Sequence, residues 1–260
     1  MSKKQIEEVI AIAAKLEVAA GGRRADLVHV DNQLGAHRYV RDARLISRAL
    51  PPGAHVLDLG CGAGQLALLL AENGLRVTAS EIFQATPPYI KYYNQHGSVE
   101  PIEYVAADVL KSDDHGLSGR CFDAIVIYGV LEHVPDFAQF LERCKSMLDT
   151  HGKLYIYQFP NRWSWREKIG DMMGNSSHEL RFDPNELSTM LRWHGFQIRN
   201  FGYEQILPVN MTMLPPAVAK LYHALSPLIF GLDRLLRALP LINRLSTSYR
   251  FECRKARTKS

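Results

Sequence analysis

Cysteine is scarce in this chain and is not arranged for metal binding. The four cysteines stand at positions 61, 121, 144 and 253, and no two of them have the short spacing of a zinc-ligand pair. We therefore expect reduced thiols, as in a cytoplasmic protein. Long hydrophobic runs are also missing: no window holds the ~18 uninterrupted apolar residues that a membrane-spanning helix needs. Residues 1–8 are too polar to resemble a secretory signal.

The chain has little excess charge of either sign. Its net charge of +4 is too small to indicate nucleic acid binding by itself, so no nucleic acid partner is expected. A local basic excess lies in the last segment, where charged ends are usually solvated: Arg250, Arg254, Lys255, Arg257 and Lys259. The length of 260 residues and the apolar fraction of 47% predict one globular domain with an elaboration.

Two well-known phosphate-binding motifs are absent. A dinucleotide-binding Gly-x-Gly-x-x-Gly would need glycine where Gln65 stands, and no Gly-Lys-Ser/Thr loop occurs. The chain instead has Asp58-Leu-Gly-Cys-Gly-Ala-Gly64 directly after an apolar strand pattern, and the next apolar strand ends on Glu81. Glycine permits a sharp turn and close backbone approach to a ligand. A carboxylate at the next strand end is placed to accept both ribose hydroxyls.

Apolar strand patterns alternate with helical ones along the middle of the chain. The expected strands are 55–59, 76–81, 102–107, 122–128 and 153–159, followed by one from 196 and a last one from 248. The expected helices are 3–20, 36–50, 64–73, 85–95, 136–148 and 184–194. This order predicts an α/β, doubly wound, mostly parallel seven-stranded sheet. N-terminal helices precede it, and a helical insertion comes before an antiparallel last strand.

The segment Asp58–Gly64 resembles motif I of the class I S-adenosylmethionine (SAM) methyltransferases. Further resemblance lies in Ile102–Val109, in Phe122-Asp-Ala-Ile-Val-Ile-Tyr-Gly-Val-Leu-Glu132-His133 and in the glycine turn at Gly152, and it covers about residues 30–203. Within this family the chain is most similar to the ubiquinone-pathway O-methyltransferases. Those enzymes carry an asparagine and an arginine ahead of the first strand, and Asn32 and Arg38 resemble that pair here.

The resemblance implies SAM as cofactor and assigns a role to each residue of its site. Gly60, Gly62 and Gly64 would make room for the methionine portion, and Glu81 would hold the ribose. Asp108 would receive the adenine amino group, with the Val109 N–H on the ring, and Tyr128 would line the site. Arg38 would pair with the cofactor carboxylate, with a surface arginine as the alternative. Asp58 is costly to bury without a partner, and either the ammonium end of the cofactor or the nearby loop N–H groups would provide one.

His133 is the first candidate for a catalytic base, because it follows the fourth strand and its unperturbed pKa lies near neutrality. It could instead cap the following helix or line the cofactor site. His178 is the second candidate, since its loop could cover the substrate, and Glu132 could hold His133. Metal-assisted relatives often show Glu-x-x-Glu-His at this turn, but this chain has Gly129-Val-Leu-Glu132-His133, so no metal is predicted.

Residues 204–246 form an apolar insertion. Leu228, Ile229, Leu232, Leu235, Leu236 and Leu239 fall on one helical face, and Asp233, Arg234 and Arg237 fall on another. A lid or core element is one interpretation. Docking on an anionic bilayer is the other, and Trp163 and Trp165, in an expected loop 161–182, could line the same entrance.

These patterns predict a cytoplasmic SAM-dependent methyltransferase that O-methylates a small-molecule, apolar or lipid-linked acceptor. Its expected parts are a helical cap (1–50), a SAM-binding core (51–203), the apolar insertion (204–246) and the last strand with a basic tail (247–260). N- or C-methylation of a small metabolite stays open, as does a catalytically silent methyltransferase fold that acts as a membrane-associated binding partner. The spacing at Gln65 disfavours a dehydrogenase. The sequence does not define the oligomeric state.

Overall fold

The computed structural model describes residues 3–21, 29–97, 100–111, 116–174, 180–209 and 215–256. Seven strands form a single sheet in the order β3-β2-β1-β4-β5-β7-β6. Their bounds are β1 His55–Leu59, β2 Arg76–Glu81, β3 Glu103–Ala106, β4 Phe122–Tyr128, β5 Leu148–Pro160, β6 Phe196–Tyr203 and β7 Ser248–Lys255. The first five strands pair in parallel, and β7 is antiparallel to both β5 and β6.

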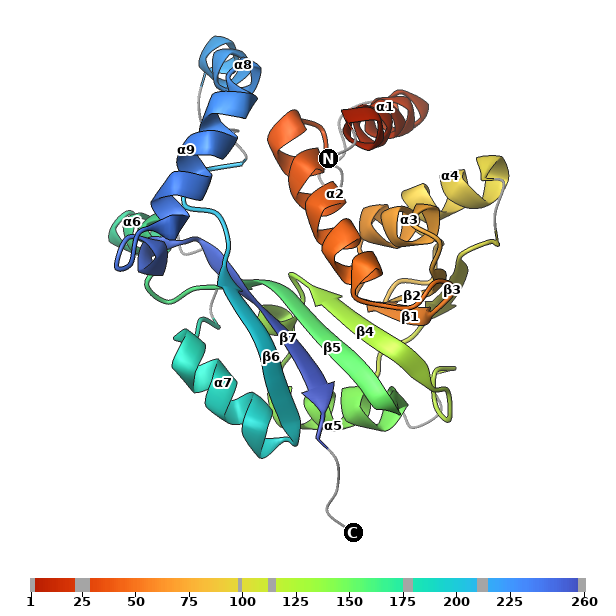
Figure 1. Ribbon diagram of the computed structural model, residues 1–260. Helices are drawn as coiled ribbons and strands as arrows, with labels where there is room; N and C mark the ends of the chain where they lie inside the picture. The colour runs from red at the N-terminus through yellow and green to blue at the C-terminus, as the bar shows by residue number, and fades with distance from the viewer. Residues whose placement is uncertain are drawn as a thin grey trace.

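Helices cover both faces of the sheet (Figure 1). One layer contains α1 (Lys3–Ala19), α2 (Gln33–Arg48), α3 (Gln65–Glu72) and α4 (Pro88–His96), which pack around one apolar core cluster. The other contains α5 (Phe137–Met147) and α7 (Pro184–Trp193), which pack around a second cluster. The central strands are buried on both faces and therefore carry runs such as Ala-Ile-Val-Ile in β4 rather than alternating residues.

Five further elements are seen in the described residues. The 3₁₀ turn η2 (Leu131–His133) follows β4, and α6 (Trp165–Met172) follows β5. Two helices, α8 (Pro216–Ala224) and α9 (Ser226–Ala238), and the 3₁₀ turn η3 (Asn243–Leu245) lie between β6 and β7. In Figure 1, α8 and α9 extend away from the sheet.

The strand order reverses between β1 and β4, which are neighbours in the sheet. Loops from these strands leave in opposite directions, so a crevice opens at their carboxyl ends, where ligands bind in this class of sheet. The glycine loop after β1, Glu81 at the end of β2 and η2 after β4 all meet this crevice.

The structure confirms the predicted fold class, its seven strands and the antiparallel last strand. The prediction of a plain loop over 161–182 is wrong, because α6 lies within it. Ser164 begins this helix, its side chain accepting a hydrogen bond from the Glu167 N–H. The short apolar pattern of α6 had not distinguished it from a loop.

All four cysteines are free. Within the described ranges, none of the helices has the length and apolar character required to span a bilayer.

Candidate active site

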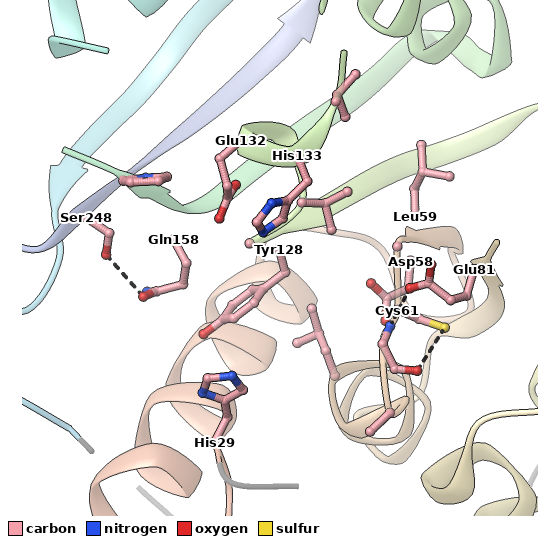
Figure 2. A pocket seen from close by; sticks show the side chains of 18 of the residues that line it. His29, Asp58, Leu59, Cys61, Glu81, Tyr128, Glu132, His133, Gln158 and Ser248 are labelled. Atoms are coloured by element: carbon pink, nitrogen blue, oxygen red, sulfur yellow. Dashed lines mark hydrogen bonds between the residues drawn. The ribbon is translucent and has the colours of Figure 1, made fainter. Parts of the chain in front are cut away.

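A cavity of about 980 Å³ lies at the carboxyl edge of the sheet. Its lining includes the glycine loop, the ends of β2, β4 and β5, the turn η2, residue 205 and residues 207–209. Ten of the residues predicted for the site line it: Arg38, Asp58, Gly60, Gly62, Glu81, Asp108, Val109, Tyr128, Glu132 and His133. Figure 2 shows part of this lining at close range.

The three glycines of the loop differ in what a side chain at each position would contact. Gly60, Gly62 and Gly64 all have positive φ, at 79°, 54° and 87°. A Cβ on Gly60 would lie 2.5 Å from Val130 Cγ2, and one on Gly64 would lie 2.6 Å from Ile90 Cγ1. Gly62 has no atom of the described residues within 4 Å of a Cβ position. Gly60 and Gly64 are therefore required for packing, whereas Gly62 leaves open space beside the cavity.

Glu81 ties β2 to the glycine loop. Its Oε2 accepts a hydrogen bond from the Gly62 N–H at 3.1 Å, and its Oε1 accepts one from the Ile82 N–H at 2.9 Å. Both bonds hold the carboxylate at the cavity wall, where it retains the lone pairs needed to accept two ribose hydroxyls. Figure 2 shows Glu81 beside Asp58 and Cys61 on one side of the cavity.

Asp58 is a buried acid, and no cation of the described residues contributes to its pKa. It is 1% exposed, and neither carboxylate oxygen has a hydrogen-bond partner among the described residues. Burial and the neighbouring Glu81 raise the pKa of Asp58 to about 7, while the Ala67 N–H acts in the opposite direction. An uncompensated buried carboxylate is costly, and a ligand ammonium would satisfy it. The residue therefore fits the amino group of an amino-acid-like ligand.

Unsatisfied donors lie in another part of the cavity. Arg38 donates through Nη1 to Gln158 Oε1 at 3.2 Å and to Gln205 Oε1 at 3.3 Å, yet its buried Nε has no partner among the described residues. The buried Nε2 of Gln158 has none either. The methionine portion of SAM carries an ammonium and a carboxylate. The unpaired Asp58 matches the ammonium, and the unpaired donors of Arg38 and Gln158 match the carboxylate.

Gln158 was missed by the sequence reasoning. It ends the regular part of β5 with φ at +60°, a conformation that is uncommon outside glycine. Its Oε1 also accepts from Ser248 Oγ at 3.1 Å (Figure 2), which ties it to β7. No local pattern marks a single glutamine in an apolar strand as a site residue, and its partner Arg38 is 120 positions away.

Tyr128 forms part of a stacked aromatic pair under Arg38. Its ring lies 4.7 Å from that of Tyr39, and the Arg38 guanidinium lies 5.2 and 5.9 Å from the two centroids. The Tyr128 hydroxyl donates to the buried Asp42 at 3.0 Å. Tyr128 therefore presents an apolar ring to the cavity and fixes the arginine above it.

The adenine end of the predicted site also lines the cavity. Asp108 Oδ1 accepts from the Leu110 N–H at 3.1 Å, and Lys111 lies 3.1 Å from Oδ2. Ile82 and Phe83, which sequence reasoning missed, follow Glu81 and are 57% and 65% exposed while lining the same cavity. Two exposed apolar residues directly after an acidic strand end are a signal that could have been recognised.

Glu132 and His133 extend from η2 toward the cavity, with Tyr128 close to them (Figure 2). The backbone N–H of His133 donates to Val130 O at 2.8 Å, which fixes the turn. His178, the other predicted catalytic residue, lies outside the described residues. Trp163 and Trp165 do not line the cavity: their indole N–H groups donate to Asp183 and to the Ile206 carbonyl, whereas Arg166 and Glu167 reach the lining.

Among the described residues, no group of three or more His, Cys, Asp or Glu side chains is close enough to bind a metal ion. At the turn where metal-assisted relatives carry a second acid, Gly129 has φ at +65°.

Comparison with known proteins gives the class. The family model described as a methyltransferase domain matches residues 34–200. A ubiquinone biosynthesis O-methyltransferase of Xanthomonas axonopodis is 30% identical over 179 residues, which cover 62% of this chain and 70% of that protein. One of Xylella fastidiosa is 37% identical over 165 residues, 60% of this chain and 66% of that protein.

Solved structures agree on the fold. The 1,6-didemethyltoxoflavin-N1-methyltransferase of Burkholderia thailandensis, solved with S-adenosylhomocysteine, matches with a TM-score of 0.53 at 22% identity, covering 84% of this chain and 79% of that one. The magnesium protoporphyrin IX methyltransferase of Synechocystis, also with S-adenosylhomocysteine, matches with a TM-score of 0.55 at 17% identity, covering 87% and 85%.

This chain belongs to the methyltransferase-domain family. The predicted class, a SAM-dependent methyltransferase enzyme with a Rossmann-like sheet, is confirmed, and with it SAM as the cofactor. The roles assigned to individual residues stay predictions.

Proposed function

We propose that this protein transfers a methyl group from SAM to a hydroxyl of an apolar or lipid-linked acceptor, with His133 as the base. The observation that supports this most directly is the set of unsatisfied groups in the cavity. The two oxygens of Asp58, Arg38 Nε and Gln158 Nε2 are all buried without a partner among the described residues.

These groups fit the cofactor from end to end. Asp58 would accept from the ammonium, and Arg38 with Gln158 would donate to the carboxylate. Glu81 would accept from the ribose hydroxyls, and Asp108 would accept from the adenine amino group with the Val109 N–H on the ring. Tyr128 and the open space at Gly62 would border the methionine portion. When bound, the cofactor supplies an electrophilic methyl group on a sulfonium, and the protein supplies alignment.

His133 lines the cavity, and an imidazole can accept the proton that the acceptor hydroxyl loses. The acceptor hydroxyl gives its proton to a neutral imidazole, and an oxygen electron pair forms the new bond to the methyl carbon. The carbon–sulfur bond breaks, its electron pair stays on sulfur, and the imidazolium later loses the proton to water. Base assistance typically contributes about 10²–10⁴-fold, and alignment contributes further.

The remainder of the cavity favours an apolar acceptor. Phe140, Pro160, Leu207, Pro208 and Val209 all contribute to its lining. The relatives in Xanthomonas and Xylella are named for ubiquinone biosynthesis, which supports a phenolic or quinone-like acceptor. A lipid-linked acceptor would bring the protein to a membrane surface, so we propose peripheral membrane association of a cytoplasmic protein.

The division into a cap (1–50), a core (51–203), an insertion (204–246) and a terminal strand with its tail (247–260) is part of the same proposal. The insertion carries residue 205 and residues 207–209 of the cavity wall, so we assign it to the acceptor side.

Two measurements test the proposed activity. Calorimetric titration with SAM and S-adenosylhomocysteine should show binding at micromolar concentrations, and labelled methyl transfer should occur with a long-chain catechol and not with an amine of matched size. Methylation of the amine instead would replace O-methylation with N-methylation. Failure of a folded sample to bind either compound would favour a silent methyltransferase fold.

A further inference from the structure

The helical insertion exposes its apolar face. Leu221, Leu225, Leu228, Leu232, Leu235 and Leu239 follow one another at spacings of three and four residues along α8 and α9, and they are between 42% and 70% exposed. Val218, Leu241, Ile242 and Leu245 are exposed as well. We call these ten side chains the leucine surface. A core role for this face is wrong, although Ile229 and Leu236 of the same pattern are partly buried.

Two polar residues of α9, Asp233 and Arg237, point into the protein instead. Asp233 is 8% exposed, and its Oδ1 accepts from the Ile206 and Leu207 N–H groups at 2.8 and 2.9 Å. Arg237 donates to Asp233 Oδ2 at 2.7 Å. The usual amphipathic surface helix packs its apolar side on the core, whereas α9 leaves Leu228, Leu232 and Leu235 exposed and buries Asp233.

Contacts on the inner side hold the helices in this orientation. The Phe230 ring stacks on His37 of α2 with centroids 3.7 Å apart, and the Tyr222 hydroxyl donates to the Pro208 carbonyl at 2.8 Å. Leu207 and Pro208 also line the cavity. The helix pair is therefore joined directly to the wall of the proposed acceptor site, and in Figure 1 it extends away from the sheet.

The exposed charged side chains between positions 205 and 247 are all cationic. Asp233 is the one acid between positions 205 and 251, and it is buried against Arg237. Lys220, Arg234 and Arg244 are exposed. Apolar side chains bordered by cations fit the interface of an anionic bilayer. Two copies of this chain would bring like charges together, which opposes self-association through the same surface.

We infer that the leucine surface docks this protein on anionic lipid bilayers and places the cavity wall at Leu207 and Pro208 next to the membrane. This inference deepens the proposed lipid-linked acceptor. Because the helices anchor Ile206 and Leu207 through Asp233, point substitutions test it better than deletion of residues 214–246, which would remove that anchor along with the surface.

The experiment is co-sedimentation of the full chain with vesicles of 70% phosphatidylcholine and 30% phosphatidylglycerol, in parallel with pure phosphatidylcholine. We expect binding to the anionic vesicles that weakens with added salt. The variant L228S/L232S/L235S should bind about tenfold less tightly or worse. The control V18S/W193S removes two apolar side chains that are 82% and 89% exposed on α1 and α7, and it should bind like the wild type.

Calorimetry with S-adenosylhomocysteine distinguishes failure of this inference from failure of the proposed function. Wild-type protein that binds S-adenosylhomocysteine but ignores the anionic vesicles would overturn docking alone. Equal loss in the surface and control variants would overturn the assignment to this surface, and equal binding to both vesicle types would overturn the role of the cations. Sedimentation velocity that shows wild-type dimers and monomers of L228S/L232S/L235S, without vesicle binding, would assign the surface to a second copy of the chain.

Discussion

The substitution Asp58→Asn should stabilise the ligand-free protein and weaken binding of the cofactor. Burial and Glu81 raise the pKa of Asp58 to about 7, from an ordinary value of 3.8. The folded state therefore keeps a proton that the unfolded state loses between about pH 4 and 7. Stability falls as the pH rises through this window, and the full penalty is present above pH 7.

The size of the effect follows from the shift. Three pKa units at 1.36 kcal/mol each give roughly 4 kcal/mol as an upper limit for the penalty at pH 8. Asparagine has nearly the same shape and never ionises, so Asp58→Asn escapes this penalty. The free energy of unfolding of the variant should exceed that of the wild type by an amount that grows from near zero at pH 4 toward that limit at pH 8.

The ligand-free fold favours a neutral side chain at position 58, whereas ligand binding should favour an ionised carboxylate there. An ammonium beside Asp58 keeps the carboxylate ionised, so wild-type protein should release about half a proton on binding S-adenosylhomocysteine at pH 7. Calorimetry in two buffers of different ionisation enthalpy measures this release. Asp58→Asn should release none at that pH and bind more weakly. A stability difference that does not change with pH, together with no proton release by the wild type, would refute this account of Asp58.

Four further substitutions test the cavity and the glycine loop beside it. Glu81→Ala should weaken binding of S-adenosylhomocysteine by roughly 1–3 kcal/mol, because two ribose hydroxyls lose their acceptor; unchanged affinity in a folded variant would remove the ribose role. His133→Ala should leave that affinity nearly intact while lowering turnover by about 10²-fold or more and flattening the acid limb of the pH–rate profile; survival of both rate and profile would exclude His133 as the base. Gly64→Ala should lower the unfolding free energy by about 1–3 kcal/mol, because φ is +87° and the new Cβ meets Ile90. Gly62→Ala should cost less stability and still impair binding, since its Cβ enters open space at the cavity; the reverse order in chemical denaturation would contradict this assignment.

Local rules carried most of the fold prediction. Parallel strands buried on both faces give continuous apolar runs, and the period changes at each helix, so strands such as 55–59 and 76–81 were located to the residue. The prediction was weakest where signals are short. The eight residues of α6 were taken for a loop, and β5 begins at Leu148 rather than near 153.

Local rules also predicted which strand-end groups line the cavity. The carboxyl ends of parallel strands lie at one edge of the sheet, so a glycine loop and an acid at two such ends lie close together. Gln158 had no such signal: its importance lies in an unsatisfied amide nitrogen and in a partner, Arg38, from another layer. Ile82 and Phe83 could have been recognised from their position directly after Glu81.

The sequence by itself determined the class of the protein, because its signals are local. Strand periodicity, the glycines of the loop after the first strand and the acid at the end of the next strand can each be recognised from residues that are neighbours in the chain. The tertiary structure decided how distant groups meet. Periodicity divides α9 into an apolar and a polar face but does not say which one faces the protein. The free N–H groups of Ile206 and Leu207 needed an acceptor, and Asp233 supplied it, so the leucines face outward. In the sequence, Asp58 is simply one acid in an apolar strand. The tertiary structure shows that its buried carboxylate oxygens have no hydrogen-bond partner among the described residues.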